Sequence, residues 1–272
     1  MSLGGRPFYF GTNVKMHQTP DDTVRYLRAI LDGATETPVA STLFVCPPFT
    51  SLPAATALTR AVPLWIGAQN MHWAASGAYT GEISPTMLTA VGVDLVLLGH
   101  AERRHHFGES DQVIRRKVGA AAEHGLRILL CVGETREERD AGVGPETIAR
   151  QLKVGLQDLP DAAVARLMIA YEPVWAIGEG GTPATPVEAV EIIRHARAVL
   201  ADRFGPEGEA VPILYGGSVD ATNCGDFAAL PEVDGLFVGR AVATADGFLT
   251  VCRTAERARR SATAVLEPVS GA

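Results

Sequence analysis

A glutamate at the end of an apolar run is the residue of this sequence best placed to do chemistry. The run Leu167–Tyr171 reads as a buried strand, and Glu172 follows it directly. Pro173 comes next and keeps Glu172 out of a helix. A carboxylate at the mouth of a strand can take a proton from carbon if a movable segment covers it and keeps water away.

The segment after Glu172 has the composition of such a cover. It is apolar at first and then closed by glycines, so we expect a lid with a hinge at each end. The predicted lid comprises Pro173, Val174, Trp175, Ala176, Ile177, Gly178, Glu179 and Gly180.

Other polar residues follow other strand-like runs. Asn13 and Lys15 come after the first run, and His100 comes after the fourth. An isolated ammonium at a strand end is costly to desolvate unless an anion meets it, although a surface lysine is the alternative. Because His100 lies where a helix begins, we expect a neutral imidazole that donates a hydrogen bond; a core or capping histidine is the alternative.

Two glycine-containing turns predict an anion site. Gly216, Gly217 and Ser218 follow the seventh run, and Gly239 and Arg240 follow the eighth. Turns that lead into helices can aim backbone N–H groups at one phosphate.

A metal site formed by Glu102, His105, His106 and Glu109 is a competing interpretation. We do not favour it, because His100 and His105 are five residues apart and do not share a helix face. Arg103 and Arg104 would also repel a cation. We instead expect Glu102 to pair with an arginine, and no metal.

The elements that position these residues alternate along the chain. Eight short apolar runs, the expected strands, alternate with helical patterns, and strands covered on both faces form a parallel sheet. This order predicts an α/β protein with a single (β/α)8 barrel over residues 6–260, with disordered termini at 1–5 and 261–272. A doubly wound open sheet is the alternative, but no glycine fingerprint follows the first run. The expected strands are Phe8–Asn13, Thr42–Cys46, Leu64–Gly67, Asp94–Leu98, Arg127–Val132, Leu167–Tyr171, Val211–Tyr215 and Gly235–Val238.

Composition narrows the class of protein. Of 272 residues, 47% are hydrophobic, which is enough for a sizeable core, and the net charge of -7 argues against nucleic acid or an anionic membrane as partner. No apolar run reaches the ~18 residues of a membrane span, and the first residues lack the core of a signal peptide. The four cysteines are widely spaced, so we expect reduced thiols and a cytoplasmic location.

With these residues in hand, the chain resembles the triosephosphate isomerase family from about Phe8 to Leu249. Together the matching motifs are highly specific, and the resemblance implies a TIM barrel. The matching stretches are Gly11–Met16, Gly77–Ser84, Leu98–Arg104, Cys131–Glu134, Ala170–Gly178 and Tyr215–Val219.

The resemblance implies a cofactor-free isomerase that interconverts dihydroxyacetone phosphate and D-glyceraldehyde 3-phosphate through an enediolate. Glu172 matches the family's base, and His100 matches the neutral electrophile that polarises the carbonyl. Lys15 and Asn13 match groups that stabilise the enediolate charge, and Glu102 matches a supporting carboxylate.

The family also implies a phosphate site and a partner. Gly178, Ser218, Gly239 and Arg240 match positions whose backbone N–H groups hold the substrate phosphate. The stretch that includes Thr80 matches a loop that reaches into a second subunit, which implies a homodimer.

Several positions depart from the family pattern. Ala101 stands where the family usually has serine, Arg240 replaces a glycine, and the lid carries Glu179 and is one residue longer. With these changes the chain resembles the branch of the family that isomerises erythrulose phosphates. A four-carbon ketose phosphate is therefore the alternative substrate. Remoter alternatives are a lyase that forms a Schiff base through Lys15 and a protein without catalytic activity.

Overall fold

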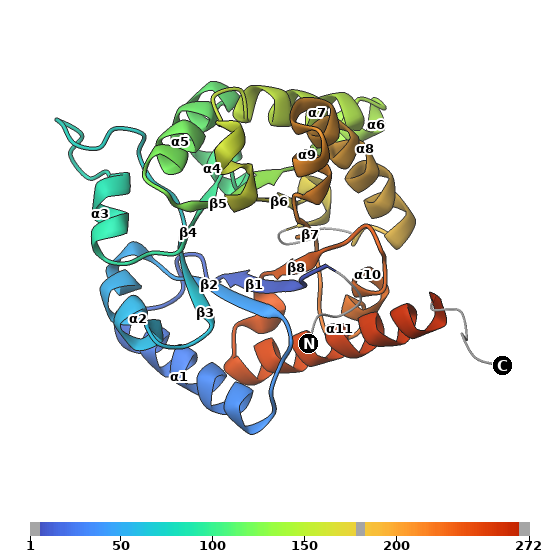
Figure 1. Cartoon of the computed structure of the whole chain (residues 1–272), viewed down its shortest axis with the longest axis horizontal. Helices are drawn as coiled ribbons and strands as arrows, with labels where there is room; N and C mark the ends of the chain where they lie inside the picture. Colours follow the sequence, from blue (N-terminus) through green and yellow to red (C-terminus); the bar gives the residue numbers. More distant parts are fainter. Residues whose placement is uncertain (1–5, 178–182, 267–272) are drawn as a thin grey trace.

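Eight parallel strands close into a barrel in chain order. The computed structural model describes residues 6–177 and 183–266. Each strand pairs with its neighbours in sequence, and β1 pairs with β8 to close the barrel (Figure 1), which rules out the open sheet. The strands are β1 (Tyr9–Asn13), β2 (Thr42–Cys46), β3 (Leu64–Ala68), β4 (Leu95–Leu98), β5 (Arg127–Val132), β6 (Leu167–Tyr171), β7 (Ile213–Tyr215) and β8 (Gly235–Val238).

Helices surround the barrel and connect successive strands (Figure 1). They are α1 (Pro20–Glu36), α2 (Leu52–Thr59), α3 (Pro85–Ala90), α4 (Ala101–Phe107), α5 (Asp111–Glu123), α6 (Arg136–Asp140), α7 (Gly144–Gly155), α8 (Pro186–Phe204), α9 (Pro206–Ala210), α10 (Cys224–Ala228) and α11 (Ala245–Leu266). Short 3₁₀ helices lie at η1 (Phe49–Ser51), η2 (Asp161–Arg166), η3 (Val174–Ala176) and η4 (Arg240–Val242).

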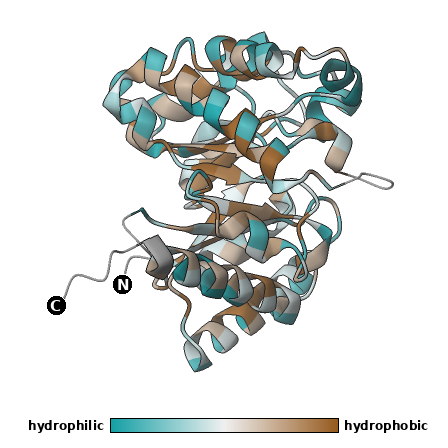
Figure 2. Ribbon diagram, turned by 90° about the vertical axis from the view of Figure 1, so that its right-hand side faces the viewer, coloured by the Kyte–Doolittle hydropathy of each residue, from teal (hydrophilic) through white to brown (hydrophobic). Residues whose placement is uncertain are grey.

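The core has two layers, because successive side chains of each strand point to opposite faces. One set fills the barrel interior, where the rings of Phe44 and Phe237 stack at 5.7 Å. The other set packs against the helices. Figure 2 shows largely brown, hydrophobic strands in the middle of the molecule, between helices that carry both teal and brown residues. A filled barrel leaves the loops at the strand ends as the place for a site.

The predicted bounds of β1, β3 and β4 each differ from the structure by one residue at one end, and two differences are larger. The seventh strand begins at Ile213 rather than Val211, because the Val211 N–H closes the last turn of α9 and Pro212 has no N–H to donate. The tail is not disordered from Ser261, because α11 continues as a helix to Leu266. Residues 1–5 and 267–272, the rest of the predicted disordered termini, lie outside the described residues.

Candidate active site

Glu172 and His100 face each other at the ends of β6 and β4. The Oε1 atom of Glu172 lies 3.6 Å from Nε2 of His100, and both residues are buried. Two glycines allow this position: a Cβ at Gly133 would overlap the Glu172 carbonyl oxygen, and a Cβ at Gly216 would lie 2.9 Å from its Cγ. The predicted base therefore lies between two glycines, whose lack of a side chain makes room for it.

The orientation of His100 is set by the start of α4. His100 is the N-cap residue, and its Nδ1 accepts the backbone N–H of Glu102 at 3.2 Å. In a neutral imidazole one nitrogen accepts and the other carries the proton, so Nε2 is the donor. That donor points toward Glu172, where a substrate oxygen would lie between the two side chains.

Glu102 pairs with Lys15, and our expectation of an arginine partner was wrong. The Lys15 Nζ donates to Oε1 of Glu102 at 2.6 Å. Arg103 and Arg104 turn away, to Glu109 and Asp111 respectively. Each of these arginines pairs with a more buried carboxylate, Glu109 in the loop after α4 or Asp111 at the start of α5, which leaves Glu102 on the rim.

The charge of Lys15 sets the protonation of its partner. Partial burial raises the pKa of Glu102, but the hydrogen bond from Lys15 and the electrostatic interactions with His100, Lys15 and His106 outweigh burial and hold the pKa below its usual value. The carboxylate is therefore charged at neutral pH.

The backbone at Lys15 is strained. Its φ of 52° is positive, and among residues 6–177 and 183–266 Lys15 is the one non-glycine residue with a positive φ. Its N–H donates to Oδ1 of Asn13 at 2.8 Å, which ties together the two predicted residues after β1. Such strain in a residue with a side chain costs about 1–2 kcal/mol and clusters at functional sites.

The two predicted anion-binding turns follow β7 and β8. The Ser218 hydroxyl donates to the carbonyl of Ala176 at 2.6 Å, so the first turn contacts the base of the predicted lid. Gly239 precedes η4, and Arg240 begins it and is exposed. Gly178, Glu179 and Gly180 lie outside the described residues.

Glu134 is a residue of this site that the sequence analysis did not assign. It is buried, and its Oε1 accepts both the indole N–H of Trp175 at 2.7 Å and the hydroxyl of Tyr171 at 3.0 Å. Burial and the Glu134 charge raise the pKa of Tyr171, so the hydroxyl keeps its proton. The carboxylate thus connects the last residue of β6 to the first part of the lid. Its only signal in the sequence was membership of the Cys131–Glu134 motif.

Cys131 lies under the base, at the end of β5. Burial, then the charge of Glu172 and a hydrogen bond to it, raise the pKa of the Cys131 thiol well above its usual value. The thiol therefore stays protonated and presents no second negative charge to Glu172.

The loop between β3 and α3 stands away from the barrel (Figure 1). The ring of His72 stacks on Trp73 at 4.0 Å and lies 4.1 Å from the ring of Tyr79, which orders the loop from within. Thr80 lies at its exposed end. The structure thus brings Glu172, His100, Glu102, Lys15 and Asn13 together, whereas Thr80 is turned outward.

Within the described residues, no cluster of three or more His, Cys, Asp or Glu side chains is placed to hold a metal ion. None of the helices in that part of the chain is long and apolar enough to cross a membrane.

Known proteins are similar to this chain in sequence and in fold. The family model for triosephosphate isomerase matches residues 8–255. The chain is 44% identical over 240 residues to a triosephosphate isomerase of Chloroflexus aurantiacus, covering 88% of this chain and 95% of that protein. It is 41% identical over 244 residues to an L-erythrulose-1-phosphate isomerase of Rhizobium etli, covering 89% and 90%.

A solved structure agrees with these relatives. The triosephosphate isomerase of Bartonella henselae superposes with a TM-score of 0.81 and 37% sequence identity, covering 92% of this chain and 98% of that one. The family model, the relatives and the fold all match along nearly the whole chain. The protein therefore belongs to the triosephosphate isomerase family.

Proposed function

We propose that this protein interconverts dihydroxyacetone phosphate and D-glyceraldehyde 3-phosphate without a cofactor. The observation that carries the proposal is the buried pair of Glu172 and His100, with 3.6 Å between the carboxylate and the imidazole donor. This pair can act on both a carbon-bound proton and the neighbouring carbonyl oxygen.

The reaction follows from these positions. Glu172 removes a proton from C1 of dihydroxyacetone phosphate, and the electrons of the C–H bond form a C1–C2 double bond. The Nε2–H of His100 donates to the C2 oxygen, and Lys15 and Asn13 stabilise the negative charge of the enediolate. His100 passes a proton from the C1 hydroxyl to the C2 oxygen, and Glu172 then returns its proton to C2. These transfers leave an aldehyde at C1 and a hydroxyl at C2, with no net change in oxidation state.

The turns after β7 and β8 hold the phosphate in this proposal. Backbone N–H groups of Gly178, Ser218, Gly239 and Arg240 would surround it, as the family resemblance implies. The lid would then exclude water, which strengthens the donors around the enediolate.

A coupled assay with purified protein tests the proposal. We expect turnover of both triose phosphates by the wild type and a loss of at least about 10³-fold in Glu172→Gln, which keeps the shape of the side chain but removes the base. Glu191→Gln, at an exposed position on α8, is the matched control and should retain full activity. Absence of turnover by the folded wild type would refute the proposed reaction.

We further propose a cytoplasmic homodimer in which Thr80 reaches the partner's active site. Exposed apolar side chains in the segments that follow β1, β3 and β4 support an interface: Met16 is 93% exposed, Tyr79 46% and Phe107, the last residue of α4, 68%. Thr80→Arg should convert a dimer into a monomer in light scattering and lower activity. A wild type that is monomeric at micromolar concentration would contradict this assembly.

A four-carbon ketose phosphate is the second candidate substrate. Ala101 favours it, because its side chain beside His100 is smaller than the serine that the family usually has. Relatives named L-erythrulose-1-phosphate isomerase also favour it, since their sequence identities of 41% and 42% are close to the 44% of a triosephosphate isomerase. The ratio of kcat/KM for the two substrates decides between them.

A further inference from the structure

Arg139 contacts residues on both sides of the segment that follows Glu172. Its Cζ atom lies 3.7 Å from the centre of the Trp175 indole ring, in the first part of the predicted lid. The same guanidinium forms an ion pair with Glu188, near the start of α8. One side chain of α6 therefore joins two parts of the chain that lie on either side of residues 178–182, which are outside the described residues.

The segment after β6 runs beside the segment after β5. The Glu172 N–H donates to the Val132 carbonyl at 2.8 Å, and the Val174 N–H donates to the Glu134 carbonyl at 3.0 Å. These hydrogen bonds continue the parallel pairing of β5 and β6 beyond the strands. The backbone position of Glu172 therefore depends on how firmly the residues after it are held.

Three side chains hold Trp175 from different directions. Glu134 accepts its indole N–H, Arg136 donates to its carbonyl at 3.4 Å, and Arg139 covers the face of its ring. A guanidinium over an indole is attracted by the negative face of the ring, and more strongly where the ring is buried, as it is here. Because a hydrogen bond at the edge of the ring still allows the ring to tilt, the contact with Arg139 fixes its orientation.

Glu188 uses its two carboxylate oxygens for different contacts. Oε2 accepts from the N–H and the hydroxyl of Thr185, at 2.7 and 2.8 Å, and completes the capping box of α8. Oε1 accepts from Arg139. The hydrogen bond from the Thr185 backbone is the largest cause that lowers the pKa of Glu188, and Arg139 adds to it, so the carboxylate is charged at neutral pH. Arg139 is thus tied to the first turn of a 19-residue helix.

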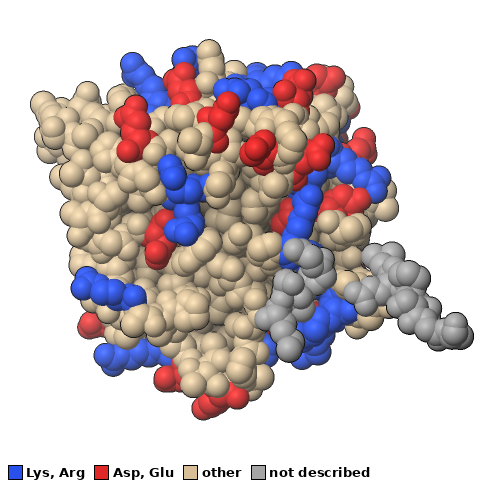
Figure 3. Space-filling model, in the orientation of Figure 1, with Lys and Arg blue, Asp and Glu red and all other residues tan. Residues whose placement is uncertain are grey.

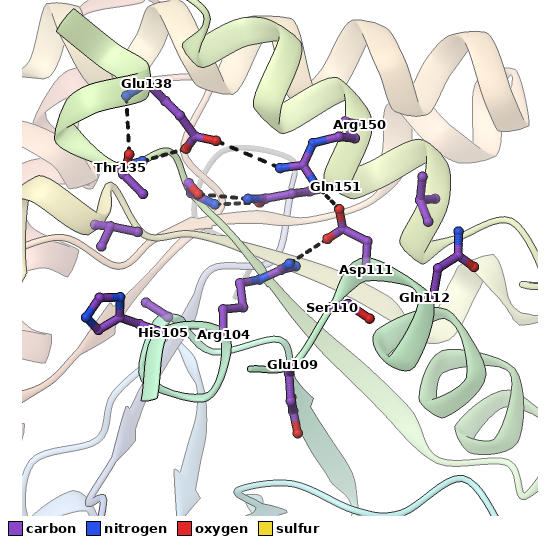
Figure 4. Close-up of a pocket in the computed structure, with 14 residues that line it drawn as sticks. Arg104, His105, Glu109, Ser110, Asp111, Gln112, Thr135, Glu138, Arg150 and Gln151 are labelled. Carbon is purple, nitrogen blue, oxygen red and sulfur yellow. Dashed lines mark hydrogen bonds and ion pairs between the residues drawn. The ribbon is translucent and has the colours of Figure 1, made fainter. Parts of the chain in front are cut away.

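The helix that carries Arg139 is anchored to its neighbours (Figure 4). Thr135 and Glu138 cap α6 by exchanging two hydrogen bonds of 2.8 and 3.2 Å. Glu138 also lies 3.9 Å from the guanidinium of Arg150 on α7, and Arg150 pairs with Asp111 on α5. These contacts hold α6 against two other helices, so it presents Arg139 from a fixed position.

We propose that Arg139 is a positioning residue of the isomerase reaction, which acts through Trp175 and Glu188 and not by contact with the substrate. The inference rests on the proposed function, in which Glu172 must reach a carbon-bound proton. By tying Trp175 to the start of α8, Arg139 limits movement of the backbone three residues after the base. A misplacement of about 1 Å costs on the order of 10²-fold in rate, so such a contact affects catalysis without touching the reacting atoms.

Arg139→Met tests this role, because methionine keeps an unbranched side chain and removes the guanidinium. We expect kcat for dihydroxyacetone phosphate to fall by about 5–30-fold, the factor that corresponds to the loss of a cation–π contact and an ion pair. KM should stay nearly unchanged, because the lost interaction acts on the transition state and not on binding of the phosphate. Arg139→Lys keeps a cation beside Glu188 but loses the planar group, so it should recover part of kcat.

Glu188→Gln separates the two contacts of Arg139. Glutamine still accepts from Thr185 and keeps the capping box, but it carries no charge for the guanidinium. We expect a smaller loss of kcat than in Arg139→Met, and a double variant as active as Arg139→Met alone, because both substitutions remove the same ion pair. Arg194→Met is the matched control: it removes an exposed arginine of α8 that pairs with Glu232 and should keep full activity.

The outcomes are distinct. An active wild type with the same kcat as Arg139→Met would overturn the positioning role and leave the proposed function intact. So would losses of kcat that multiply in the double variant, or a loss that equals the fraction of unfolded protein found by chemical denaturation, since Arg139 would then serve stability alone. A folded wild type that isomerises neither triose phosphate would overturn the proposed function, and this inference with it.

Discussion

Lys15 and Glu102 form an ion pair of 2.6 Å at the rim of the barrel, between the ends of β1 and β4. Both side chains are partly exposed. Figure 3 shows basic and acidic side chains interspersed over one face of the molecule. In the proposed reaction, this pair holds the ammonium near the substrate oxygens and offsets its charge. Several measurable consequences follow from this contact and from those around it.

Shortening the base should slow the reaction. Glu172→Asp keeps the charge but withdraws the carboxylate by about 1 Å, and a misplacement of that size costs on the order of 10²-fold in kcat. Steady-state kinetics on dihydroxyacetone phosphate measure the effect. A rate close to wild type would remove Glu172 from the role of base.

Two substitutions of Lys15 separate the effect of its backbone strain from the effect of its charge. Lys15→Gly and Lys15→Ala both remove the ammonium, so each should lower kcat/KM by at least about 10²-fold. Only glycine adopts a φ of 52° without strain, so the glycine variant should have the larger free energy of unfolding, by about 1 kcal/mol. Urea denaturation of the two variants measures this difference, and equal stabilities would contradict the strain.

The ion pair of Glu102 predicts a dependence of stability on pH. Its pKa is lowered in the folded protein, so the stabilisation is fully present above the unfolded carboxylate pKa of about 4.3 and is lost as the pH falls through the folded value. The free energy of unfolding of wild type should therefore exceed that of Glu102→Gln at pH 6, and the gap should close toward pH 3. A gap that widens as the pH falls would show the opposite shift.

The buried carboxylate of Glu134 should matter for both stability and the lid. Glu134→Ala leaves the Trp175 indole N–H and the Tyr171 hydroxyl without an acceptor, which costs about 2 kcal/mol of unfolding free energy. Glu134→Gln retains an acceptor and should cost less. Chemical denaturation of the wild type, Glu134→Ala and Glu134→Gln measures the difference. Equal stabilities would show that these hydrogen bonds do not hold Trp175 at the start of the predicted lid.

The strands could be predicted because each one is a continuous apolar run between polar segments. Thr42–Cys46, Arg127–Val132, Leu167–Tyr171 and Gly235–Val238 have the predicted bounds. The start of β7 was predicted wrongly because the Val211 N–H bonds to Gly208 and completes α9 instead. The predicted disorder from Ser261 was wrong because α11 continues to Leu266. Apolar periodicity does not contain that information.

The sequence predicted which strand ends carry the site residues, but it did not predict which side chains contact one another. The positions of Glu172, His100 and Lys15 follow from the parallel order of the strands. The partner of Glu102 depended on which carboxylate each neighbouring arginine could reach. Glu134 was not assigned a role, because the sequence does not show that the fold buries it. Both depend on side-chain packing over long separations in sequence.

Isotope exchange tests the central claim most directly. When the purified wild type converts dihydroxyacetone phosphate in deuterated water, proton nuclear magnetic resonance should show deuterium at C2 of the D-glyceraldehyde 3-phosphate formed, because the proton passes through Glu172 and exchanges with solvent. Glu172→Gln should show neither conversion nor exchange. Conversion without any deuterium in the product, or exchange that persists in Glu172→Gln, would contradict a carboxylate-catalysed enediolate mechanism.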